Sequence, residues 1–271
     1  MTYQDYLARV DAVLTIPGTS VTDDFNSARK GYEHLVTLLI DEHTTTQDKL
    51  NQAVVTGDNK LIRGALAAHT LAELASRDYD TRNAAERATL ATLRLAYRAT
   101  ATANYHAVAA WYNDQAKALA EDVAAVDIAA RAEDVISGTA KARTAWEYAP
   151  LHAQALEQAA TVLHEAAYLA EVQLHHTTHE RHTDQRLALT LDPSTLGIRE
   201  LWSLWDQEEE HRAGRYGALA AAHVKLRAAD IDDFAPHRRP KPFETTYVPS
   251  GRGHRAVQLD PEDPASLAQI A

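Results

Sequence analysis

Residues 65–137 read ALAAHTLAELASRDYDTRNAAERATLATLRLAYRATATANYHAVAAWYNDQAKALAEDVAAVDIAARAEDVIS, and this stretch contains neither glycine nor proline. It is far longer than an average helix, so it must hold two or more helices or one very long helix. We expect a turn near residues 78–80 and a long helix over about residues 82–135, which Gly138 ends. The stretch therefore predicts a fold built on long helices.

The overall composition supports the same fold class. Hydrophobic residues make up 45% of the chain, whereas aromatic residues make up only 7% and glycine occurs only 10 times. Much of the apolar content is alanine, which has the best helix propensity, while strands favour branched and aromatic residues. We predict an all-α protein, an antiparallel bundle of long and short helices with enough apolar material for a real core.

Capping residues locate the first helices. Thr2 and Asp5 have the spacing of a capping box, so a first helix begins there and ends before residues 16–18. Thr22 caps a second helix, with acidic residues in its first turn at the positive end of the helix dipole. The N-terminal region therefore begins with two helices joined by a short connection.

Further breaks are expected along the second helix and after it. We expect residues 44–46, three threonines, to end the second helix, and a short helix over about residues 47–56 to stop at Gly57. Asp58 is then placed to cap the next helix, which runs to near residue 77.

Proline and glycine divide the later helices. A helix over residues 141–148 meets Pro150, which either begins a new helix or kinks a continuous one. We expect helix over residues 151–190, and a last helix from residue 194 or 195 to about residue 229.

The C-terminal residues differ from the rest of the chain. Residues 236–271 hold six of the nine prolines and carry a charge of +1, so the remaining residues carry −12. Such a segment does not pack a core of its own and is ordered only when it docks on a surface. We divide the chain into a helical body, residues 1–235, with a candidate sub-boundary near residues 78–81, and an extended Pro/Arg-rich C-terminal arm, residues 236–271.

A basic arm on an acidic body suggests electrostatic docking, within the chain or between subunits. We expect aromatic, aliphatic and basic side chains of the arm to bind the partner surface: Arg238, Arg239, Lys241, Phe243, Tyr247, Arg252, Arg255 and Val257.

Histidines offer a different chemistry. On a continuous helix, Glu171, His175, His179 and His182 share one stripe, and imidazole nitrogens with a carboxylate can ligate Zn or Fe. The same sequence is also typical of a polar helix face. The stripe is therefore the alternative to a protein that needs no cofactor.

Other function classes lack their sequence signals. The chain has no cysteine, no glycine loop of the kind that cradles phosphates and no Gly-x-Ser-x-Gly elbow. The acidic body disfavours nucleic-acid binding, although the arm is basic. No stretch resembles a leader or a membrane span, so we expect no membrane insertion and a protein that is cytoplasmic or incorporated in a virion.

By elimination, we predict a structural or assembly protein, in its specific form a phage virion component, whose arm docks on neighbouring subunits. We expect the partners to be copies of the chain or other subunits of an assembly, and no catalytic residues. A metal-binding protein or metalloenzyme that uses the histidine stripe is the first alternative. A regulatory adaptor that binds a partner along Trp202 and Trp205 is the second, although these side chains also suit a core.

Overall fold

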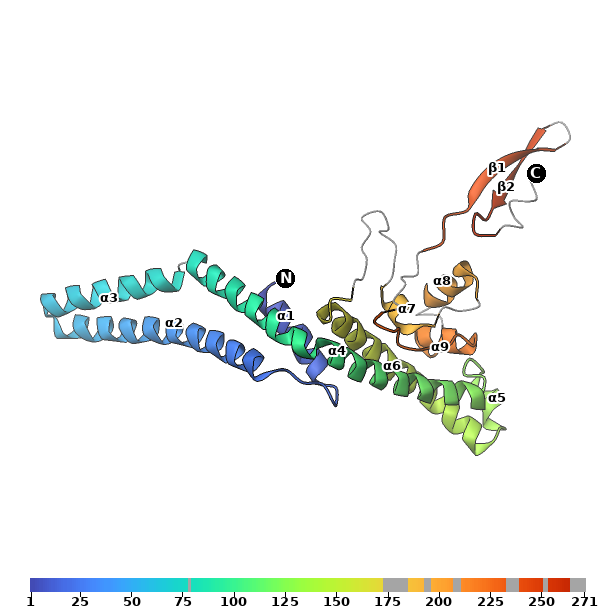
Figure 1. The fold of residues 1–271 in the computed structure, drawn as a ribbon, viewed down its shortest axis with the longest axis horizontal. Helices are drawn as coiled ribbons and strands as arrows, with labels where there is room; N and C mark the ends of the chain where they lie inside the picture. Colours follow the sequence, from blue (N-terminus) through green and yellow to red (C-terminus); the bar gives the residue numbers. More distant parts are fainter. Residues whose placement is uncertain are drawn as a thin grey trace. The chain divides into compact units, whose positions relative to one another are not determined.

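The computed structural model describes residues 1–77, 79–172, 185–192, 196–206, 211–232, 239–250 and 253–263. These residues form helices and one small antiparallel sheet, so the prediction of an all-α protein is confirmed (Figure 1). The chain divides into two compact units, Met1–Asn104 and Tyr105–Ala271. The proposed division into a body and an arm stays a prediction. None of the helices in the described ranges is long and apolar enough to cross a membrane.

The first unit contains α1 (Tyr3–Leu14), α2 (Asp23–Thr56), α3 (Asn59–Arg77) and the first part of α4 (Tyr79–Ala125). The predicted capping box is present, because Thr2 and Asp5 each accept a backbone N–H of the other. Thr22 caps α2 as predicted. The core is rich in aromatic rings and branched aliphatic side chains; its large members include Tyr3, Tyr6, Phe25, Tyr32, Leu93 and Tyr97.

The predicted break in α2 at residues 44–46 is wrong, since α2 continues to Thr56. The hydroxyl of Thr46 donates to the carbonyl oxygen of His43 at 2.9 Å, so the helix itself satisfies this polar side chain. Gly57 ends α2 in the left-handed conformation with φ 71°, as predicted. Asp58 accepts the backbone N–H groups of the first turn of α3, also as predicted.

Asn104, the last residue of the first unit, is buried and fully engaged. Its side-chain oxygen accepts the N–H of Ser20 at 2.9 Å, and its amide donates to the carbonyl of Ser20 at 2.8 Å and to the hydroxyl of Tyr97 at 3.1 Å. The amide therefore ties the connection between α1 and α2 to α4.

The long helix is shorter than predicted at its C-terminal end. It ends at Ala125, and a separate helix, α5 (Ala132–Ile136), follows. The carboxylate of Asp127 accepts the N–H of Ala129 at 2.9 Å, and its carbonyl accepts the N–H of Ala130 at 3.1 Å. These bonds form a turn in place of helical ones, which is the reason for the break.

Pro150 lies inside a continuous helix, α6 (Ala140–Leu169). Proline has no N–H, so the carbonyl of Trp146, one turn earlier, loses its helical donor. A guanidinium nitrogen of Arg212 donates to that carbonyl at 2.5 Å, and the same guanidinium lies 3.4 Å from the centre of the Trp146 ring. A side chain from another part of the second unit therefore compensates for the proline.

The predicted helices over residues 151–190 and 194–229 are wrong in part. Among the described residues after α6 the helices are short: α7 (Gln185–Thr190), α8 (Ile198–Asp206) and α9 (Gly214–Ala221). Gly214, the first residue of α9, and His223, just after its end, have positive φ values of 60° and 59°, which break a continuous helix. Residues 224–230 are extended, and Leu226 of this segment forms a bridge with Leu191.

The arm is not only extended, because it contains a hairpin of β1 (Glu244–Ser250) and β2 (Gly253–Leu259). The strands pair antiparallel, with Thr246 opposite Val257 and Tyr247 opposite Ala256. A two-stranded hairpin is marginally stable alone, so its base must be anchored elsewhere.

We expect Arg212→Ala to lower the free energy of unfolding by about 1–3 kcal/mol, because it removes a charged hydrogen bond to a helix carbonyl and a stacked cation. In a Pro150→Ala background the loss should be smaller, since residue 150 then supplies an N–H for the Trp146 carbonyl. Urea unfolding of the four chains in this double-mutant cycle measures the difference. Equal losses in the two backgrounds would contradict the assigned role of Arg212.

Candidate docking site of the C-terminal arm

Arg239 forms the first contact between the arm and α8. Its guanidinium makes a bidentate ion pair with the carboxylate of Asp206, with N–O distances of 2.8 and 3.2 Å. It also lies 4.1 Å from the centre of the Trp202 ring, which is only 2% exposed. Because the guanidinium is planar, it can form the bidentate ion pair and lie over the aromatic ring at the same time, which a lysine side chain does not do. Arg239 therefore fixes the start of the described arm against the C-terminal end of α8.

Arg199 forms the second contact, at the N-terminal end of α8. Its Nε donates to Asp260 Oδ2 at 2.5 Å and a terminal nitrogen donates to the carbonyl of Lys241 at 2.6 Å. The guanidinium lies 4.0 Å from the centre of the Phe243 ring. One arginine of the helix thus holds the chain both before β1 and after β2.

The arm also closes on itself beside Arg199. The N–H of Lys241 donates to a carboxylate oxygen of Glu262 at 2.9 Å, and the N–H of Glu262 donates to Asp260 at 2.9 Å. Leu259, at the end of β2, is buried. The base of the hairpin is therefore a closed and anchored structure.

The two faces of the hairpin differ. One face carries the exposed Glu244 and Arg255 at its ends, and between and beside them side chains that are buried or half-buried: Thr246, Val248, Val257 and Leu259. The opposite face is exposed along both strands, and Tyr247 on that face is 69% exposed. Within the described part of the chain each strand pairs only with the other, so both outer edges keep unpaired backbone groups.

The structure brings some of the predicted arm residues together and leaves others apart. Arg239 and Phe243 contact α8 through their side chains and Lys241 through its backbone carbonyl, whereas Tyr247, Arg255 and Val257 lie on the strands of the hairpin. Two further arginines predicted as contacts, Arg238 and Arg252, lie outside the described residues. The α8 side of the site was not predicted as a partner of the arm.

Trp202 and Trp205, considered as a partner-binding surface, are each only 2% exposed. Trp205 packs edge-on against Tyr216 at 5.6 Å, and Arg239 covers Trp202. Their burial makes them core residues of the second unit.

The predicted histidine stripe is interrupted at its start. Glu171 follows the end of α6 and has a positive φ of 54°, so it does not continue that helix as predicted. His175, His179 and His182 lie outside the described residues. Among the side chains that the structure does describe, no group of three His, Asp or Glu is arranged to hold a metal ion.

A histidine–carboxylate pair joins α4 to α6. His152 Nδ1 lies 2.6 Å from Asp122 Oδ2, and Asp122 is buried. Such a carboxylate orients an imidazole and fixes its tautomer, as it does in acid–base catalysis, but it equally serves as a link between two helices. Because Asp122 and His152 lie on different helices, we assign the pair to helix packing.

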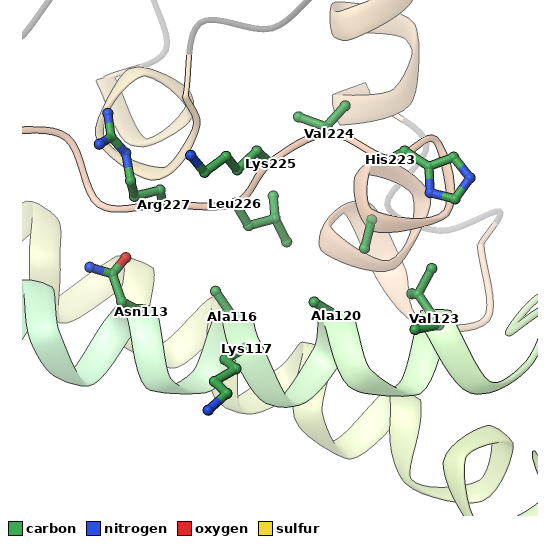
Figure 2. Close-up of a pocket in the computed structure, with 12 residues that line it drawn as sticks. Asn113, Ala116, Lys117, Ala120, Val123, His223, Val224, Lys225, Leu226 and Arg227 are labelled. Atoms are coloured by element: carbon green, nitrogen blue, oxygen red, sulfur yellow. The ribbon is translucent and has the colours of Figure 1, made fainter.

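A cavity of about 520 Å³ lies between the second part of α4 and the extended segment after α9. Figure 2 shows Leu226 projecting toward Ala116 and Ala120 of α4, whereas Arg227 on the same segment points away from this helix. The small side chains on α4 leave the space open. Lys225, also in its lining, forms an ion pair with Asp192 at 3.2 Å. Sequence patterns could not predict this cavity, because its walls come from separate parts of the chain.

The chain matches no protein-family model, and no curated protein or solved structure is significantly similar to it. We therefore infer function from the geometry of the arm and of the surfaces around it.

We expect Arg239→Ala to increase hydrogen exchange of the hairpin amides about fivefold, because an exposed ion pair and an exposed cation–π contact together contribute about 1 kcal/mol. Mass spectrometry of peptides from residues 239–263 measures the change. Arg255→Ala, which removes an exposed arginine of the hairpin itself, is the matched control and should change little. Equal effects of the two substitutions would show that Arg239 does not anchor the arm.

Acid should release the arm through Asp260. The hydrogen bond from Arg199 lowers the pKa of this carboxyl below its ordinary value of 3.8. A lowered pKa in the folded state means that the contact is fully stabilising above pH 3.8 and is lost as the pH falls through the lower value. A fluorophore on Gln258→Cys, in a chain that otherwise lacks cysteine, should therefore lose anisotropy in this acidic range.

The control for this titration is the same labelled chain with Asp260→Asn. Its anisotropy should be lower already at neutral pH and should change less with acid. An unchanged acid transition in this variant would show that Asp260 does not govern release.

Proposed function

We propose that this protein is a structural component of a larger assembly, and that its C-terminal arm docks on neighbouring subunits. The observation that carries the proposal is the contrast within the arm. Arg199 and Arg239 hold its base on α8, while one face of its hairpin is exposed and carries Tyr247 at 69% exposure. The arm therefore presents a contact surface at a defined place.

Anchoring the base favours binding through the hairpin. A free tail loses much conformational entropy when it binds, whereas an arm already held at both ends of its hairpin loses less. The bonds from Arg199 to Asp260 and to the Lys241 carbonyl fix these two ends. The anchored hairpin is thus preorganised for a partner.

The chemistry of the hairpin suits a protein partner. Its outer strand edges offer backbone groups for strand addition, and an exposed aromatic side chain beside them offers an apolar contact. Tyrosine is enriched in protein interfaces because its ring is apolar and its hydroxyl forms hydrogen bonds. The basic residues of the arm would also attract the acidic body of a neighbouring copy.

A phage virion component is the specific form that we propose. Particles of this kind repeat each weak contact many times, so a modest arm contact is sufficient to lock the assembly. The proposal of a virion component depends on analogy between architectures, because a fold alone does not define a function.

The solution mass by light scattering tests the proposal. We expect the full-length chain to form an oligomer that high salt weakens, and Tyr247→Ser to reduce association without releasing the base of the hairpin from α8. Tyr148→Ser, at a tyrosine that is 47% exposed on α6, is the matched control. A chain that ends at residue 235 should lose the arm-dependent association altogether. If full-length and truncated chains have the same association state under all conditions, the arm is not an assembly device.

A further inference from the structure

The hairpin of α2 and α3 has a thin core of its own. The two helices lie side by side and antiparallel (Figure 1). From residue 43 to residue 74, Ala53 and Ala72 are the only side chains that the structure shows as buried. The contacts between the helices include polar groups, such as Thr46 and His69 at 3.4 Å. Two helices with so little buried apolar surface are normally completed by further helices.

An apolar stripe on α3 is left exposed. Leu61, Gly64, Ala68 and Leu71 follow one another at spacings of three, four and three residues, which places them on one seam of the helix. Leu61 is 54% exposed and Leu71 is 68% exposed. We call these four residues the α3 stripe. Exposed leucines on a regular seam are typical of a helix–helix interface.

The α3 stripe is complementary to itself in the antiparallel direction. Around a two-fold axis at the level of Leu66, Leu61 of one helix lies opposite Leu71 of the other, and Gly64 lies opposite Ala68. The small residues at the centre allow the two backbones to approach closely, while the leucines close the seam at both ends.

Charges along α3 favour the same direction. Lys60 and Arg63 lie near its N-terminal end, and Glu73 and Arg77 lie near its C-terminal end. An antiparallel pair about Leu66 places Glu73 of each helix beside Lys60 of the other, with Arg77 beyond the end of the other α3, and it also aligns the helix dipoles favourably. A parallel pair would bring like charges together.

We propose that the α3 stripe binds the α3 stripe of a second copy of this chain, antiparallel, so that two α2–α3 hairpins form a four-helix bundle. The contact is isologous and closes as a dimer. It lies in the first unit and does not depend on the C-terminal arm, so it adds a self-association surface to the one proposed above.

The first test compares leucines that differ only in their place on α3. Leu61→Gln with Leu71→Gln should raise the dimer dissociation constant of the full-length chain at least about a hundredfold, because each copy loses two buried leucines. Leu66→Gln, at a leucine 50% exposed on another side of α3, should have little effect. Circular dichroism should show unchanged helix content in both variants. A monomeric wild-type chain, or equal effects of the two variants, would overturn the proposal.

The second test determines direction by crosslinking, which is clean because the chain has no native cysteine. In the antiparallel pair, residue 61 lies about 15 Å along the axis from residue 61 of the other copy but level with residue 71. A short bismaleimide should therefore crosslink a mixture of Leu61→Cys and Leu71→Cys chains into heterodimers, while each chain alone crosslinks poorly. Crosslinking of Leu61→Cys chains to one another would indicate a parallel pair and overturn the proposal.

The proposal for the arm and the proposal for the α3 stripe can be rejected independently of each other. If Tyr247→Ser leaves the solution mass unchanged while the Leu61 and Leu71 substitutions dissociate the dimer, the proposed arm function is wrong and the stripe proposal stands. The reverse result rejects the stripe and supports the arm.

Discussion

An arginine guanidinium stacked on an aromatic ring is the interaction on which the second unit depends. It occurs where α8, α9 and the arm meet their neighbours: Arg199 on Phe243, Arg212 on Trp146, Arg215 on Trp205 and Arg239 on Trp202. The long helices are rich in alanine, which packs closely but contributes little area per residue. Short helices with few contacts therefore need larger side chains that combine stacking with hydrogen bonds.

Local signals in the sequence predicted helix ends well. Thr2, Thr22, Gly57 and Asp58 act on backbone groups within a few residues, so their effect is independent of the rest of the chain. At Pro150 the sequence left open a new helix or a kinked continuous one, because the outcome depends on a distant partner. Pro150 does not end α6, because Arg212 supplies the missing donor from a position that lies far along the sequence. No local pattern could reveal that compensation.

The β-hairpin in the C-terminal arm was not predicted, for a different reason. Glycines at positions 251 and 253 separate two runs that contain β-branched residues, which is a hairpin signal, but the many prolines around them indicated an extended arm. The α8 side of the docking site could not be predicted from the sequence, since Arg199 and Asp206 are ordinary charged residues of a short helix. The predicted metal ligands are mostly outside the described residues, so that prediction is untested.

The two proposed association surfaces have different physical character. The arm is small, charged and anchored by arginines, so salt and acid act on it, whereas the α3 stripe is apolar and only the charges beside it are screened by salt. A protein with both would assemble in two stages that solution conditions separate. Self-association through α3 would precede docking through the arm wherever the ionic strength is high.

α4 is one continuous helix of 47 residues that passes from the first unit into the second at Asn104. Breaking a helix in the middle leaves unsatisfied backbone groups on both sides of the break, and restarting it requires a new nucleus. Loss of packing in either unit would therefore fray a helix on which the other also depends. The boundary at Asn104 is thus a division of contacts that falls inside one hydrogen-bonded helix.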